Sequence, residues 1–261
     1  MATWQLIKEG PTPKMNDPIL VEGLPGIGNV GKVAIDFIID ELKAKKIYSL
    51  FSHTFPHSVF VNERNVVELP SIEIYYKKMK GKKNDLLFLT GDVQPIDEKS
   101  SYDFCATVLD YLKKINGKMV ITTGGIGLQE LPEKPKVYIT GNDEALVNKF
   151  AKGINVEKKI HGVVGPIIGV TGLLLGLGTR RGIKGVALLA ETFGHPMYLG
   201  VKGAKEMLRI FNKKLGLNIN LNKLTKEIEK LEKETIKRTK ELSSVTNQIG
   251  TKKISETSYI G

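Results

Sequence analysis

The chain has 261 residues, 41% of them hydrophobic, which is enough for one large domain or two small ones around a sizeable core. No apolar run reaches the roughly 18 residues of a membrane span, and the first residues lack a signal-peptide pattern, so we expect a cytoplasmic protein. The net charge of +11 comes from 39 basic and 28 acidic residues that are interleaved along the chain. This pattern does not favour nucleic acid as a partner, and a basic surface facing an acidic protein explains it as well. The many lysines and glutamates are typical of a thermostable protein.

In the first half of the chain, short apolar runs alternate with helical periodicity. The apolar run at 19–21 predicts a buried strand, residues 23–31 a glycine-rich loop, and the spacing of apolar residues from 30 to 42 a helix with a wide apolar face. Further strands are expected at 47–51, 58–61, 66–69, 72–76 and 85–90, with a hairpin turn at 62–65. A helix is expected at 98–115, and it contains the single cysteine, Cys105. One cysteine excludes an internal disulfide, and we expect its side chain to be a small buried hydrophobe.

The second half continues the alternation of strand and helix. We expect strands at 119–122, 137–140 and 185–190, helices at 144–152, 165–177 and 204–215, and a loop over the glycine-rich residues 124–127. This order predicts a core domain, residues 1–218, that is a three-layer α/β/α sandwich with a mostly parallel, partly mixed central sheet.

A different pattern begins after the core domain. Leu224, Ile228 and Leu231 recur at spacings of three and four between lysines and glutamates, which predicts an amphipathic helix at 219–243. We interpret this apolar stripe as an oligomerisation surface. The polar residues 244–261 then predict a flexible tail.

Residues 26–31 (Gly-Ile-Gly-Asn-Val-Gly) match the dinucleotide-binding pattern G-x-G-x-x-G between a strand and a helix. That function also needs an acidic residue at the end of the second strand, and residues 48–53 contain none. We therefore interpret these glycines as a packing turn and expect no cofactor.

Few other side chains have the spacing of a catalytic or metal site. His53 and His57 flank Pro56, which prevents the helix that would place both histidines on one face, so no metal site is expected. Glu191 and His195 follow the last expected strand, where ligands collect in α/β sheets, and they are the one potential acid and base pair. The alternative function is accordingly a phosphorylase-like or nucleotide-using enzyme built on residues 26–31 with Glu191 and His195.

Four segments together resemble the archaeal homologues of the proteasome assembly chaperones. They are residues 21–31, residues 87–95 with the pattern Gly-Asp-Val-Gln-Pro at their end, residues 169–174 and residues 188–192. The resemblance implies a fold like that of the nucleoside phosphorylases, no catalytic residues and a homo-oligomer. It also implies that the partner is a proteasome α subunit, the α ring, or a paralogous protein of the same family.

The resemblance also implies a role for the C-terminus in binding a partner. Proteins of this kind often end in a hydrophobic residue, a tyrosine and any residue, and this tail docks between α subunits with its carboxylate on a lysine. The chain ends in Tyr259, Ile260 and Gly261, with the tyrosine third from the end and Ser258 before it in place of a hydrophobic residue. Tyr259, Ile260 and Gly261 are therefore the expected partner-binding residues.

Overall fold

The computed structural model describes residues 4–162, 165–195 and 198–221. The chain divides into a unit of residues 1–221 and a unit of residues 222–261. Most of the expected helix at 219–243 and all of the tail at 244–261 therefore lie outside the described residues. Within that expected helix, Ile219 and Asn220 are not helical. Ile219 is instead held by Asn212, whose side chain bonds its backbone N–H and C=O at 3.0 and 2.8 Å.

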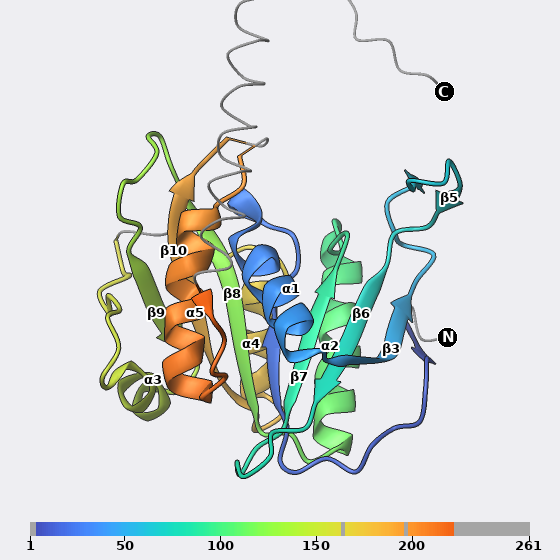
Figure 1. The fold of residues 1–261 in the computed structure, drawn as a ribbon, viewed down its shortest axis with the longest axis horizontal. Helices are drawn as coiled ribbons and strands as arrows, with labels where there is room; N and C mark the ends of the chain where they lie inside the picture. Colours follow the sequence, from blue (N-terminus) through green and yellow to red (C-terminus); the bar gives the residue numbers. More distant parts are fainter. Residues whose placement is uncertain (1–3, 163–164, 196–197, 222–261) are drawn as a thin grey trace, which may run out of the picture. The chain divides into compact units, whose positions relative to one another are not determined.

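A central sheet of eight strands forms the middle layer of the first unit (Figure 1). Its order is β1 (Gln5–Lys8), β3 (Lys45–Phe51), β6 (Ile72–Lys77), β7 (Leu86–Gly91), β2 (Ile19–Glu22), β8 (Met119–Leu128), β10 (Lys184–Phe193) and β9 (Val137–Gly141). The four strands β7, β2, β8 and β10 are parallel, and the strands on both sides of them pair antiparallel. The expected α/β class with a mixed sheet is confirmed, with the parallel part confined to the middle.

Helices cover both faces of this sheet. Helix α1 (Val30–Leu42) packs against α5 (Val201–Leu215) on one face, and α2 (Glu98–Lys114) packs against α4 (Val170–Thr179) on the other (Figure 1). The short helix α3 (Glu144–Ala151) lies beside β9 at the edge. Asp97 and Asp143 cap α2 and α3 by accepting backbone N–H bonds at 2.8 and 2.7 Å, which stabilises each helix start. Among the described residues, no helix is both long and apolar enough to cross a bilayer.

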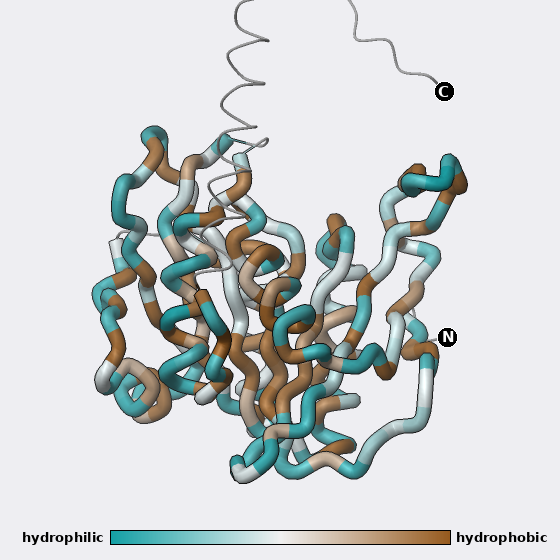
Figure 2. Tube along the Cα trace, viewed as in Figure 1, coloured by the Kyte–Doolittle hydropathy of each residue, from teal (hydrophilic) through white to brown (hydrophobic). Residues whose placement is uncertain are grey.

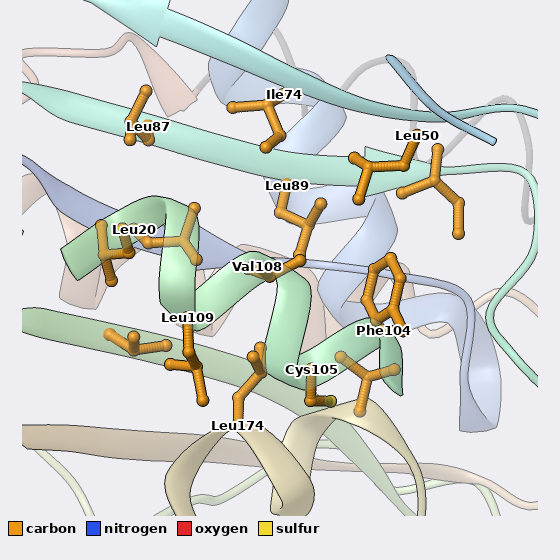
Figure 3. Close-up of a cluster of buried hydrophobic side chains, with 14 of the residues drawn as sticks. Leu20, Leu50, Ile74, Leu87, Leu89, Phe104, Cys105, Val108, Leu109 and Leu174 are labelled. Atoms are coloured by element: carbon orange, nitrogen blue, oxygen red, sulfur yellow. The ribbon is translucent and has the colours of Figure 1, made fainter. Parts of the chain in front are cut away.

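A large group of buried side chains lies between helix α2 and the sheet (Figure 3). Phe104, Cys105 and Val108 of α2 are fully buried, together with Leu89 of β7 and Leu174 of α4. Burial of each large apolar side chain contributes about 1.5–3 kcal/mol, so this cluster anchors α2 and α4 to the sheet. The expectation that Cys105 is a buried hydrophobe is confirmed, and burial raises the pKa of its thiol, with the nearby Glu22 carboxylate raising it further.

The structure corrects the expected loop at 124–127. Strand β8 continues through these residues to Leu128, paired in parallel register with β10 as far as Phe193. The glycines in this stretch allow the close approach of a neighbouring segment, because a Cβ on Gly125 would lie 2.1 Å from the carbonyl oxygen of Ile27. Helix α4 also begins at Val170 rather than at residue 165, after Gly169 at a φ of +82°.

A separate hairpin of β4 (Phe60–Val61) and β5 (Val67–Glu68) links β3 to β6, as the sequence predicts. Asn62 closes its turn: its side-chain oxygen accepts the N–H groups of Arg64 and Val66 at 2.9 and 3.0 Å, and its nitrogen donates to Glu68 at 2.6 Å. In Figure 2 the hairpin, at the right of the view, carries hydrophobic segments outside the core.

Candidate functional site

The four parallel strands end at one edge of the sheet, and several of the segments singled out in the sequence meet there. This edge holds Glu22 at the end of β2, the glycine-rich residues 23–31, Gln94 after β7, and the start of α4. In open α/β sheets, ligands bind beyond the carboxyl ends of parallel strands where adjacent connections diverge. The carboxyl edge of β7, β2, β8 and β10 is therefore the candidate site.

Glu22 is the buried ionisable group at the centre of this edge, with an exposed fraction of 1%. One carboxyl oxygen accepts the backbone N–H of Leu24 at 2.8 Å, and the other lies 3.4 Å from the N–H of Thr123 and 3.4 Å from the hydroxyl of Thr171. These contacts connect β2 to β8 and to the first turn of α4. Glu22 thus joins three elements that are distant in sequence.

The environment of Glu22 favours the protonated carboxyl. Burial raises its pKa to about 7, against the opposing effect of the bonds from Leu24, Thr123 and Thr171. The Thr171 hydroxyl has one hydrogen to donate and two acceptors nearby. Its oxygen lies 3.0 Å from the carbonyl oxygen of Thr123 and 3.4 Å from a carboxyl oxygen of Glu22. The Thr171 hydrogen therefore serves one of these two acceptors at a time, and the shorter distance is that to Thr123.

The glycine-rich loop packs directly on the ends of β8 and β10. Gly28 has a φ of +63°, and a Cβ there would lie 2.5 Å from the hydroxyl oxygen of Thr192. A Cβ on Gly31 would lie 2.1 Å from the hydroxyl oxygen of Thr123. The carbonyl of Gly28 accepts the N–H of Gly200, at 2.6 Å, which ties the loop to the start of α5.

Many backbone donors of this loop are already bonded within the protein. The N–H of Gly23 donates to Leu89, that of Leu24 to Glu22, and those of Gly26 and Asn29 to each other's side-chain and backbone oxygens. A phosphate site would instead present such groups toward the ligand. The geometry agrees with the interpretation of residues 26–31 as a packing turn.

Gln94 connects the loop to α4. Its side-chain nitrogen donates to the carbonyl of Pro25 at 2.7 Å, and its oxygen lies 3.4 Å from the N–H of Val170 in the first turn of α4. Residues from three of the motif segments therefore meet through this one amide. The contacts between these motif segments hold the carboxyl edge together.

The structure places Glu191 and His195 near the same edge of the sheet. Both carboxyl oxygens of Glu191 are engaged by the strand-β9 side, from the N–H of Lys136 at 2.9 Å and the hydroxyl of Tyr138 at 3.1 Å. The ring of His195 stacks on Phe193, with 5.7 Å between ring centroids. In this position Glu191 links the strand β9 side of the sheet to β10.

The two histidines considered for a metal site, His53 and His57, lie in the segment between β3 and the hairpin. His53 packs edge-on against Phe51 at 5.2 Å, and His57 is exposed in the loop before the hairpin. Within residues 4–162, 165–195 and 198–221, no group of three or more His, Cys, Asp and Glu side chains is arranged to hold a metal ion.

A groove of about 710 Å³ lies between the β9 region and α5, and its lining includes Lys136, whose N–H bonds Glu191. Basic side chains on its walls outnumber acidic ones: Lys134, Lys136, Arg209 and Lys213 face Glu157 and Glu206. Arg209 is paired with Glu206. This groove is a basic surface of the kind expected from the net charge.

The remaining expected site residues, Leu224, Ile228, Leu231, Tyr259, Ile260 and Gly261, lie outside the described residues. Two features escaped the sequence interpretation. Glu22 was missed because a carboxylate directly before a glycine loop reads as the polar end of a strand. The exposed hairpin side chains were missed because alternating valines are equally typical of a buried strand.

Comparison with known proteins gives consistent matches. The family model described as the PAC2 family matches residues 20–238. Crystal structures of two Pyrococcus furiosus proteins are similar to this chain. PbaB, an archaeal proteasome activator, is 34% identical with a TM-score of 0.83, and the match covers 92% of this chain and 100% of PbaB. PbaA, an archaeal homolog of proteasome-assembly chaperone, is 26% identical with a TM-score of 0.73, and the match covers 94% of this chain and 95% of PbaA. The uncharacterized protein MJ1210 of Methanocaldococcus jannaschii is 29% identical over 84% of this chain and 81% of its own length.

Proposed function

Because the chain belongs to the PAC2 family, we propose that it is a non-catalytic binding protein of the proteasome, acting as an assembly chaperone or activator in the cytoplasm. The observation that carries this proposal is the likeness to PbaB, which extends over 92% of the chain at 34% identity. The likeness to PbaA, a homolog of a proteasome-assembly chaperone, points to the same process.

The carboxyl edge supports a binding role over an enzymatic one. Its central carboxyl group, Glu22, is buried and bonded on both oxygens, and Glu191 is held by Lys136 and Tyr138. A general acid or base needs an atom within reach of a substrate. Both acids are engaged in bonds that hold the fold together in this arrangement, and these bonds favour the binding role over the phosphorylase-like alternative.

The proposed partner is a proteasome α subunit or the α ring, contacted through Tyr259, Ile260 and Gly261, with a paralogous protein of the family as the other candidate. A single short tail offers a small anchor and binds weakly. A homo-oligomer presents several tails to a ring at once, and avidity raises the apparent affinity by roughly 10²–10⁴ when the geometry permits. Self-association and binding of the ring are therefore linked in this proposal.

The test is co-purification of α rings with the full chain and with a variant that lacks Tyr259, Ile260 and Gly261. The truncation is expected to abolish binding and to leave the oligomer mass unchanged. Amidation of the C-terminal carboxylate is expected to weaken binding, because it removes a charge-assisted contact.

A control separates the tail from the basic groove. Charge reversal of Lys136 and Lys213, both on the groove wall, is expected to leave binding by the full chain intact. Binding that survives the truncation but fails at high salt or with the groove variant would move the contact to the folded body, because exposed ion pairs are screened by salt.

The helix stripe is the proposed oligomerisation surface. Changing Leu224, Ile228 and Leu231 together to Asp is expected to lower the oligomer mass in light scattering, since burial of each is worth about 2–5 kcal/mol. An unchanged mass together with an unchanged melting temperature would remove the stripe from the interface.

A further inference from the structure

The hairpin of β4 and β5 has one face made only of branched aliphatic side chains. Val61 pairs with Val67 across the two strands, and the same register continued outward places Val59 opposite Leu69. Side chains two residues apart point to the same side of a strand, so Val59, Val61, Val67 and Leu69 share one face. We call these four residues the hairpin face; the opposite side carries Phe60, Asn62, Val66 and Glu68.

The hairpin face is uncovered in the single chain. Its four side chains have exposed fractions between 51% and 64%, although such residues are commonly buried. An isolated two-stranded hairpin is only marginally stable in water, and a sheet with an apolar face is stable when that face is packed against another element. The face is therefore available to pack against a partner.

Charge indicates which molecule covers it. The hairpin region, residues 58–69, holds Glu63, Glu68 and Arg64 as its charged residues, a net charge of −1 on a chain of net charge +11. An acidic partner is drawn to the basic surfaces of the chain rather than to this region. Repulsion between two copies of a chain of net charge +11 is weakest where the local net charge is small, so the hairpin is a place where copies can approach.

The composition of the hairpin face also favours a second copy of the chain as its partner. Interfaces between permanently associated copies resemble a domain core cut in half, whereas transient contacts are as polar as the rest of the surface. The hairpin face carries four aliphatic side chains and no charge. Glu63 and Arg64 stand beside each other in the turn, where a second copy in the reversed orientation finds the opposite charge on each.

We propose that the hairpin face packs against a second copy of this chain and forms the apolar centre of a self-association interface. The contact involves residues far in sequence from Leu224, Ile228 and Leu231, and it rests on the self-association part of the proposed function rather than on the identity of the partner. It also explains why valines lie at a hairpin that projects from the sheet beside β3 and β6 (Figure 1).

The test compares Val67→Asp with Val66→Asp in the full chain. Val67 and Val66 are neighbours of the same type with exposed fractions of 63% and 53%, on opposite faces of the hairpin. Sedimentation equilibrium over a range of concentrations measures self-association, and far-UV circular dichroism checks the fold. Val67→Asp is expected to weaken self-association at least tenfold and Val66→Asp to leave it unchanged, because only the first places a charge in the contact. A milder pair, Val61→Thr with Val67→Thr, applies the same test if Val67→Asp fails to fold.

Four outcomes would contradict the proposal. Equal masses for Val67→Asp and the unaltered chain would show that the face is free in the oligomer, and equal weakening by Val66→Asp would show that the effect is not specific to this face. Retained self-association with lost α-ring binding would assign the face to the proteasome. A monomeric unaltered chain would remove both this proposal and self-association from the proposed function, whereas failure of α-ring binding alone would leave this proposal standing.

Discussion

Replacing Glu22 by Gln tests whether the carboxyl edge holds a protonated acid. The folded protein raises the pKa of Glu22 from 4.5 to about 7, mainly through burial. The folded state then binds the proton more tightly than the unfolded state, so the contribution of this group to stability is full below pH 4.5. It is lost as the pH rises toward 7. Glutamine stays neutral throughout and has no such dependence.

The size of the effect follows from the two pKa values. Each pH unit between them is worth about 1.4 kcal/mol, so the protonated carboxyl contributes about 3 kcal/mol in full. Between pH 5 and pH 8 the unaltered protein is expected to lose about 2–3 kcal/mol of unfolding free energy relative to Glu22→Gln. Titration of every other group occurs in both proteins and cancels in this comparison.

Urea unfolding at fixed protein concentration measures the effect. The fluorescence of Trp4 reports it, because this single tryptophan is buried against Phe104 with 4.8 Å between ring centroids. Glu130→Gln, at an exposed position, is the control for loss of one negative charge. The difference in unfolding free energy between Glu22→Gln and the unaltered protein is expected to rise with pH, and that for Glu130→Gln to stay flat. A flat difference for Glu22→Gln would refute the protonated carboxyl.

Three further changes probe the packing of the body. Asp85→Ala is expected to cost about 3 kcal/mol of unfolding free energy in urea denaturation, because the buried carboxylate accepts from the N–H groups of Asn16 and Met79 and from the hydroxyl of Tyr76; a loss below 1 kcal/mol would contradict this. Gly28→Ala is expected to lower the melting temperature, since φ is positive and Thr192 blocks the Cβ, whereas Gly26→Ala, with open space, leaves it unchanged. Cys105 is expected to react with a thiol reagent only after unfolding, because it is fully buried with a raised pKa; rapid modification of the native protein would show an opening at α2.

Helix α1 shows which part of the fold the sequence predicts well. Its boundaries, Val30–Leu42, are those expected from periodicity, because a helix is fixed by residues within a few turns of each other. The end of α5 at Leu215 was also predicted correctly. Gly216 follows it in the left-handed conformation that commonly ends a helix. Strand β1 was not expected, because its four residues have a weak pattern and gain their structure by pairing with β3.

The candidate site was less predictable because it depends on contacts between distant segments. The glycines at 124–127 indicate a loop when taken alone, yet the approach of Ile27 to Gly125 and the pairing with β10 make them part of β8. The same holds for Glu22, whose environment is set by Thr123 and Thr171, about 100 and 150 residues away. Local pattern does not contain such contacts, so the burial of this acid was visible only in the structure.

The position of β2 between β7 and β8 has a consequence for synthesis on the ribosome. Ile19 pairs with Leu86 on one side and with Met119 on the other, about 100 residues later in the chain. At translation rates of about 5–20 residues per second, roughly 5–20 seconds pass between the synthesis of strand β2 and that of its second neighbour, β8. During that interval the apolar side chains of Leu20 and Val21 lack their final cover, and closing so long a loop makes folding slow. The nascent chain therefore passes through a period in which the apolar side chains of its central strand are open to aggregation.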